Sequence, residues 1–233
     1  MLTGMQARIV IELAPGWRER DALQAAAALA GSMDAELVGL FVEDAELLRF
    51  AALPFALEIG FASAQRRRLD VTEVERSLRA HAAEAERTLA STAERSAIRW
   101  SFRVARGVAA RELLVAAMGA ATEEATRDLR LLLLGDGGSA ATRWAEQARE
   151  QLGRSGEDDD DAMRVSLVHA ADLAELAAAL QHDLPGVVVL LGDEDVLARR
   201  DLQALLREAA APVLVLPRQA TRSRMNPGSR SRS

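Results

Sequence analysis

The residues most able to do chemistry lie in one loop, Gly135-Asp136-Gly137-Gly138-Ser139, which follows the apolar run Leu131 to Leu134. Glycines let backbone N–H groups approach an anion, and a helix is expected directly after the loop, so the loop could wrap a phosphate. Asp136 opposes this, because a carboxylate repels a phosphate unless a cation lies between them. Glycines also follow buried strands where the chain simply turns sharply. Both interpretations of this stretch, a phosphate-binding loop and a plain turn, therefore stay open.

The other reactive side chains form no recognisable constellation. His81, His169 and His182 lie far apart and not at a metal-binding spacing. The chain has no cysteine and no lysine, which excludes thiolate sites, cysteine nucleophiles, a P-loop lysine and Schiff-base chemistry. Ser139 lacks the nucleophile-elbow pattern, and no serine, histidine and acid group into a triad. We therefore predict no catalytic residue and no metal site.

The charge pattern limits the possible partners. The acidic run Glu157 to Asp161 could hold a divalent cation, but consecutive like charges are typical of a solvated, flexible loop. A net charge of −6 and a pI near 5.3 argue against a nucleic-acid-binding body. No run approaches the roughly 18 apolar residues of a membrane span. We expect a cytoplasmic protein with no membrane insertion and no nucleic-acid partner.

Seven apolar stretches that alternate with helical patterns predict the fold. Strands are expected near residues 7–13, 36–42, 98–104, 130–135, 164–168, 187–191 and 213–217. The stretch 98–104 alternates apolar with polar residues, which predicts an edge strand with one solvated face. This order indicates an α/β fold, a doubly wound and mostly parallel Rossmann-like sheet with helices on both faces. We expect the first strand to lie centrally, between the second strand and the leucine strand 130–135. The ligand crevice would then lie between Pro15-Gly16 and Gly135 to Gly138, and these loops are the candidate cofactor-binding residues.

Two segments after the second strand carry further expectations. Glu43 to Phe55 is predicted to be a short helix or lid, and with Phe61 it holds three of the five phenylalanines. It could cover the core beside the second strand, close over a ligand, or bind a partner. Gln65 to Ser96 has the apolar stripe of one long amphipathic helix. The cluster Arg66-Arg67-Arg68 at its start is either solvated or in contact with an acidic partner.

The later chain repeats a strand–helix–strand unit, at about 98–136 and 163–193. Leu133-Leu134-Gly135-Asp136 in the first unit is echoed by Leu190-Leu191-Gly192-Asp193 in the second. We assign residues 1–217 to a single domain. Residues 218–233 are rich in Arg, Ser, Pro and Gly and nearly lack apolar residues, so they are expected to be a disordered tail.

The sequence from Arg8 to Pro54 and the closing run Pro212-Val213-Leu214-Val215-Leu216-Pro217 resemble the universal stress protein family. ATP-binding members of that family carry an acid at the end of the first strand and a two-part glycine pattern after the fourth. Here Gly135 and Gly138 match the first part, but Ala148 and Arg149 stand where the second part begins. The first strand ends in Leu13-Ala14-Pro15-Gly16, without the acid.

The resemblance implies a non-catalytic stress-response module that docks a partner protein or assembles with itself, without a resident cofactor. Two alternatives stay open: an ATP- or nucleotide-binding stress protein using Gly135 to Ser139, and an enzyme on a Rossmann-like sheet. The closing strand Val213 to Leu216 comes last in the chain, and we expect it at the sheet edge, where free ladder groups can pair. Many members of the family dimerise through this strand, so the expected assembly is a homodimer.

Overall fold

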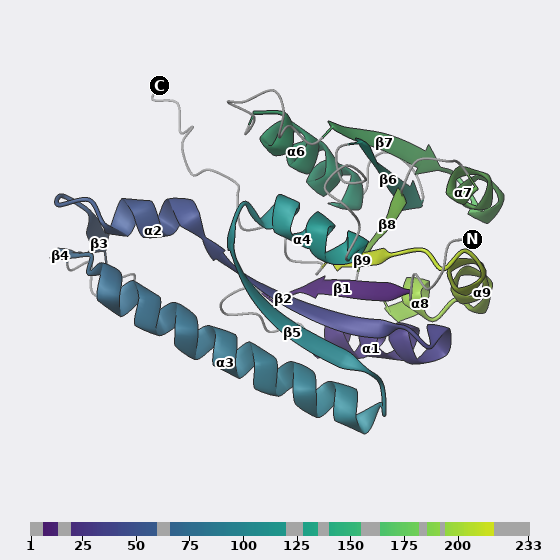
Figure 1. Ribbon diagram of the computed structural model, residues 1–233, viewed down its shortest axis with the longest axis horizontal. Helices are drawn as coiled ribbons and strands as arrows, with labels where there is room; N and C mark the ends of the chain where they lie inside the picture. The colour runs from purple at the N-terminus through teal and green to yellow at the C-terminus, as the bar shows by residue number, and fades with distance from the viewer. Residues whose placement is uncertain are drawn as a thin grey trace, which may run out of the picture.

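The fold is built on one parallel sheet with the strand order β5-β2-β1-β9-β8-β6-β7 (Figure 1). It is seen in a computed structural model that describes residues 7–13, 20–59, 66–119, 128–134, 140–154, 164–181, 186–191 and 194–216. The strands are β1 (Arg8–Glu12), β2 (Glu36–Asp44), β5 (Trp100–Gly107), β6 (Asp128–Leu134), β7 (Arg164–Ala170), β8 (Gly186–Leu191) and β9 (Val213–Leu216). All seven predicted strands are confirmed within three residues at each end.

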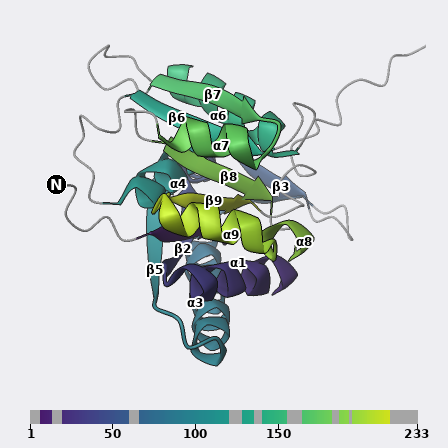
Figure 2. The same ribbon diagram turned by 90° about the vertical axis from the view of Figure 1, so that its right-hand side faces the viewer.

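Helices cover both faces of this sheet, as predicted. One face carries α1 (Arg20–Met33), α3 (Val71–Arg95), α7 (Leu173–Leu180), α8 (Glu194–Leu197) and α9 (Arg200–Glu208). Figure 2 shows α1, α8 and α9 along this face. The other face carries α4 (Ala109–Met118) and α6 (Ala140–Arg154). Connections that lead along the sheet toward β5 place their helices on the first face, and connections that lead toward β7 place theirs on the second face. This is the arrangement that results when all the crossover connections have the same handedness.

A small hairpin that the sequence did not predict precedes α3. Its strands β3 (Leu57–Ile59) and β4 (Arg66–Arg68) pair antiparallel. The predicted helix start at Gln65 is therefore wrong, and α3 begins at Val71. The physical cause is a helix cap, since the Asp70 carboxylate accepts the Thr72 N–H at 2.8 Å and Glu73 lies in the first turn. The spacing of Asp70 and Glu73 is the sequence signal that marks this start.

The closing strand β9 lies at the centre of the sheet, so the predicted edge position is wrong. β9 pairs with β1 through Ile9 and Val213 and with β8 through Val188 and Val213. All four β9 side chains are at most 1% exposed. A strand that is apolar on both faces fits an interior place. The edges are β5 and β7, and the alternating polar residues of β5 predicted its edge position correctly.

The leucine strand β6 is not a neighbour of β1. β6 pairs with β7 and β8, and two strands, β9 and β8, separate it from β1. The predicted pairing of these strands, and with it the predicted crevice between Pro15-Gly16 and Gly135 to Gly138, is therefore wrong. The local sequence indicates that a strand is buried, but it does not indicate which strands lie beside it. The strand that pairs with β1 at the position expected for β6 is β9, the last strand of the chain.

The two repeated units correspond to β5–α4–β6 and β7–α7–β8. They are not equivalent in space, because α4 and α7 lie on opposite faces of the sheet. Their second strands nevertheless pair directly in parallel, with Leu131 opposite Val187 and Leu133 opposite Val189. The echoed sequences therefore belong to neighbouring strands. The predicted tail, 218–233, lies outside the described residues.

The interior place of β9 predicts a large stability loss for Leu214→Ala. The Leu214 side chain is 0% exposed, and truncating such a leucine costs about 2–5 kcal/mol of unfolding free energy. Val104→Ala on the edge strand β5 is the control, because Val104 is 52% exposed and should cost within about 0.5 kcal/mol. Denaturant unfolding of both variants measures this. A small loss for Leu214→Ala would contradict the central position.

Candidate functional site

The candidate cofactor-binding residues, Gly135 to Ser139 together with Pro15 and Gly16, lie outside the described residues. The strands that lead into them are described and end at Leu134 and Glu12. Because β9 and β8 lie between these two strands, the structure does not bring their carboxyl ends together. The acidic run from Glu157 to Asp161 and His182 also lie outside the described residues.

A switch point lies instead between β6 and β8. The chain passes from β6 to α6 on one face and from the neighbouring β8 to α8 on the opposite face. In open α/β sheets, ligands bind in the crevice outside the carboxyl ends of such a strand pair. In the sequence, a Gly-Asp pair follows each strand, Gly135-Asp136 and Gly192-Asp193. The echo of these sequences was the signal that could have paired the two strands.

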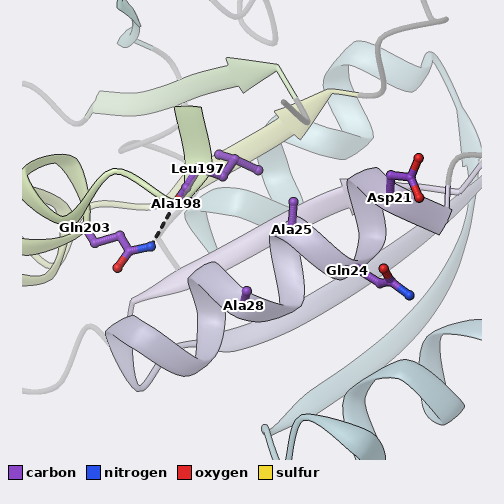
Figure 3. Close-up of a pocket in the computed structure, with 7 residues that line it drawn as sticks. All are labelled: Asp21, Gln24, Ala25, Ala28, Leu197, Ala198 and Gln203. Atoms are coloured by element: carbon purple, nitrogen blue, oxygen red, sulfur yellow. Dashed lines mark hydrogen bonds between the residues drawn. The ribbon is translucent and has the colours of Figure 1, made fainter. Parts of the chain in front are cut away.

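A groove of about 300 Å³ lies between α1 and the α8–α9 turn (Figure 3). It is lined by Asp21, Gln24, Ala25, Ala28, Leu197, Ala198 and Gln203. Gln203 Nε2 donates a hydrogen bond to the carbonyl oxygen of Leu197 at 2.8 Å, which joins the start of α9 to the end of α8. The volume is at the lower end for small-molecule sites. Nothing in the sequence singled out these residues, since alanines and glutamines on helices are common.

The chemistry available to this groove is limited to binding. Asp21 is the one titratable side chain among its lining residues, so the lining offers no acid–base pair. Ala25 and Leu197 form a buried apolar part, while Asp21 and Gln24 are exposed. The groove can therefore hold a small group by contact and hydrogen bonding.

An ion pair fixes the start of α9 beside the groove. Arg199 donates to the two Asp201 carboxylate oxygens at 3.2 and 2.8 Å, and the Leu202 N–H donates to Asp201 at 2.9 Å. The hydrogen bond from Arg199 is the main cause that lowers the pKa of Asp201, and the same bond raises the pKa of Arg199. Asp201 therefore keeps its charge, and its contact with Arg199, to a lower pH than an ordinary aspartate.

Two buried nitrogen atoms among the described side chains lack a hydrogen-bond partner, His81 Nδ1 and Arg130 Nη1. Arg130 is 6% exposed and lies near the amino end of β6, opposite Ser166 and Gly186 of the neighbouring strands. In the described part of the chain, no three His, Asp or Glu residues are grouped as a metal site would require. None of the described helices combines the length and apolarity needed to cross a membrane.

Exposed apolar side chains are frequent along α2 (Ala45–Ala51), the chain that follows it and the first residue of β3, a segment at the left end of the molecule in Figure 1. Five of its residues are 40–71% exposed, and together they are called the α2–β3 surface: Leu47, Phe50, Leu53, Phe55 and Leu57. Leu48 faces inward and packs in a cluster with Phe41 and Leu78. The segment thus covers the core beside β2 with one side, as one of the three predictions had it, and leaves the other side open.

Arginines border the α2–β3 surface. Arg67 forms ion pairs with Glu58 and, at 3.3 Å, with Glu73. Arg68 Nε donates to the carbonyl oxygen of Pro54 at 3.2 Å. The exposed Arg66 forms no ion pair with any described residue. Of the arginine cluster, Arg67 therefore links the two hairpin strands, Arg68 ties the hairpin to the chain before it, and Arg66 is exposed.

Comparison with known proteins gives limited similarity. No family model matches the chain, and no curated protein matches it. Among solved structures it is similar to a protein from the universal stress protein family from Burkholderia pseudomallei, with 19% identity over 72% of this chain and 98% of that chain and a TM-score of 0.33. It is also similar to a universal stress protein from Archaeoglobus fulgidus, with 13% identity, coverages of 92% and 97%, and a TM-score of 0.33. Similarity at this level does not assign the chain to a family.

Proposed function

We propose that the protein is a non-catalytic, cytoplasmic regulatory module that binds a partner protein through the α2–β3 surface. The observation that carries this proposal is the exposure of five large apolar side chains within eleven consecutive residues, Leu47 to Leu57. Contiguous apolar patches above a few hundred Å² are uncommon on monomeric proteins, and the largest such patch is often a binding site. Phe55, at 71% exposed, is the most open of the five.

The α2–β3 surface is also anchored to the rest of the fold. Leu48 and Ala51 are 8% and 3% exposed and fix α2 to the core. The hairpin is closed by the ion pair between Arg67 and Glu58 and by the hydrogen bond of the Leu69 N–H to the Ala56 carbonyl oxygen at 3.0 Å. A surface ordered before binding loses less conformational entropy on association. Phenylalanine beside arginine is also a composition enriched in protein interfaces.

A stress-response role is part of the same proposal. It is supported by the sequence resemblance of Arg8 to Pro54, which folds as β1–α1–β2–α2, and of the proline-flanked closing run to universal stress proteins. In this role the module would regulate a partner by contact, with no reaction of its own.

Site-specific photo-crosslinking tests partner binding. A benzophenone amino acid in place of Phe55 should give a heavier adduct in cells, because a bound partner would lie against this position. The matched control carries the same group in place of Val115, an exposed apolar residue of α4 at 40% exposure, and should give none. Equal crosslinking at the two positions, or none at Phe55, would remove the proposal.

A second candidate function is nucleotide binding at the carboxyl edge of the sheet. It is favoured by the switch point between β6 and β8, which is where α/β sheets bind ligands. In this candidate, the Gly135 to Ser139 loop would contact the phosphates and ATP would be the ligand.

Isothermal titration with ATP and Mg²⁺ separates the two candidates. If the protein is a regulatory module that needs no nucleotide, ATP should give no binding heat even at high protein concentration. Micromolar binding that Gly138→Arg abolishes would favour the nucleotide-binding protein instead, since an arginine side chain would fill the space of a phosphate loop.

A further inference from the structure

We propose that the partner at the α2–β3 surface is a second copy of this chain, which makes the protein a two-fold symmetric dimer. The inference rests on the proposed function, because it names the partner of the same surface. Phe55 would lie near the symmetry axis and meet the α2–β3 surface of the other copy. A homodimer is also expected from the sequence, but through β9. The dimer proposed here forms through the α2–β3 surface instead.

The sheet itself excludes the contact expected from sequence. Both edges of β9 are occupied, by β1 and by β8, and its side chains are buried on both faces. Two copies could therefore pair through β9 only after the sheet had opened. The α2–β3 surface needs no such change, and α2 also contacts the edge strand β5, whose Val104 is 52% exposed.

The exposed apolar area agrees with the needs of a stable dimer. With about 200 Å² for a fully exposed large side chain, the five residues at 40–71% exposure leave on the order of 500 Å² open. A stable interface buries roughly 800 Å² per partner, and its core is about two-thirds apolar. The α2–β3 surface can therefore supply the apolar part of such an interface, and the bordering arginines and acids can supply the polar rim.

The charges around the surface favour a second copy over a membrane. The described side chains between Glu43 and Arg76 include five arginines, Arg49, Arg66, Arg67, Arg68 and Arg76, and six acids, Glu43, Asp44, Glu58, Asp70, Glu73 and Glu75. This near balance lets one copy face another without local repulsion, and Arg66 can meet an acid across the axis. Anionic membranes attract clusters of about four to eight basic residues, but here six acids outnumber the five arginines, and Arg67 is paired with Glu58 and Glu73.

The charge of the whole chain fixes the expected salt dependence. Each copy carries a net charge of −6, so two copies repel one another at distances beyond the contact, and salt screens this repulsion. A dimer held by apolar contacts should therefore become tighter as salt concentration rises. A complex held by arginines against an acidic partner or an anionic lipid would become weaker.

Light scattering and sedimentation of the full chain over a concentration series test the dimer. The 25.1 kDa chain should give a mass of about 50 kDa, with tighter association at higher salt. Phe55→Glu should weaken the association constant at least about tenfold, because it buries a charge at the axis. Phe55 is 71% exposed, so this variant should keep the wild-type circular dichroism. Val115→Glu on α4 is the matched control and should stay dimeric.

Several outcomes would overturn the dimer. These are a wild-type monomer at every concentration, a Phe55→Glu variant that stays dimeric, and association that weakens with salt. A monomer that binds phosphatidylserine vesicles through Phe55 would assign the surface to a membrane instead. A monomer whose Phe55 position crosslinks to a different protein would overturn the dimer and leave the proposed partner-binding function standing. A monomer with no crosslink at Phe55 would remove both.

Discussion

The structure depends on the pairing of β9 with β1 on one side and β8 on the other. This pairing joins the half sheet β5-β2-β1 to the half sheet β8-β6-β7. Val213 and Val215 pack among the residues of α1 and α9, while Leu214 and Leu216 pack among those of α4 and α6. The last strand of the chain therefore completes both hydrophobic layers at once, and neither half would be closed without it.

The position of β9 also decides which strands form the edges of the sheet. Since β9 is interior, the free sheet edges are β5 and β7. Between β2 and α3 the chain adds α2 and the β3–β4 hairpin, and Leu48 of α2 packs with Phe41 and Leu78 on the inner side. The outer side of α2 and the hairpin is the surface to which we assign function.

Local patterns predicted the elements, but not their neighbours. The apolar runs at β6, β8 and β9 predicted buried strands, and the alternation in β5 predicted an edge, because burial and exposure act on each residue locally. Strand order depends on pairing between distant segments, which leaves no local signal, so β9 was expected at the edge and β6 beside β1. The start of α3 could have been found from Asp70 and Glu73. The groove at Ala25 and Leu197 could not, because those residues look like any helix interior.

Hydrogen exchange on the full chain at two protein concentrations tests the central claim, that β9 is interior and the α2–β3 surface is the contact. The amides of Val213 to Leu216 should exchange slowly at both concentrations, since interior strands open only with the whole fold. The amides between Ala45 and Leu57 should become more protected as the protein concentration rises. Protection of Val213 to Leu216 that rises with concentration, while Ala45 to Leu57 does not change, would contradict the account.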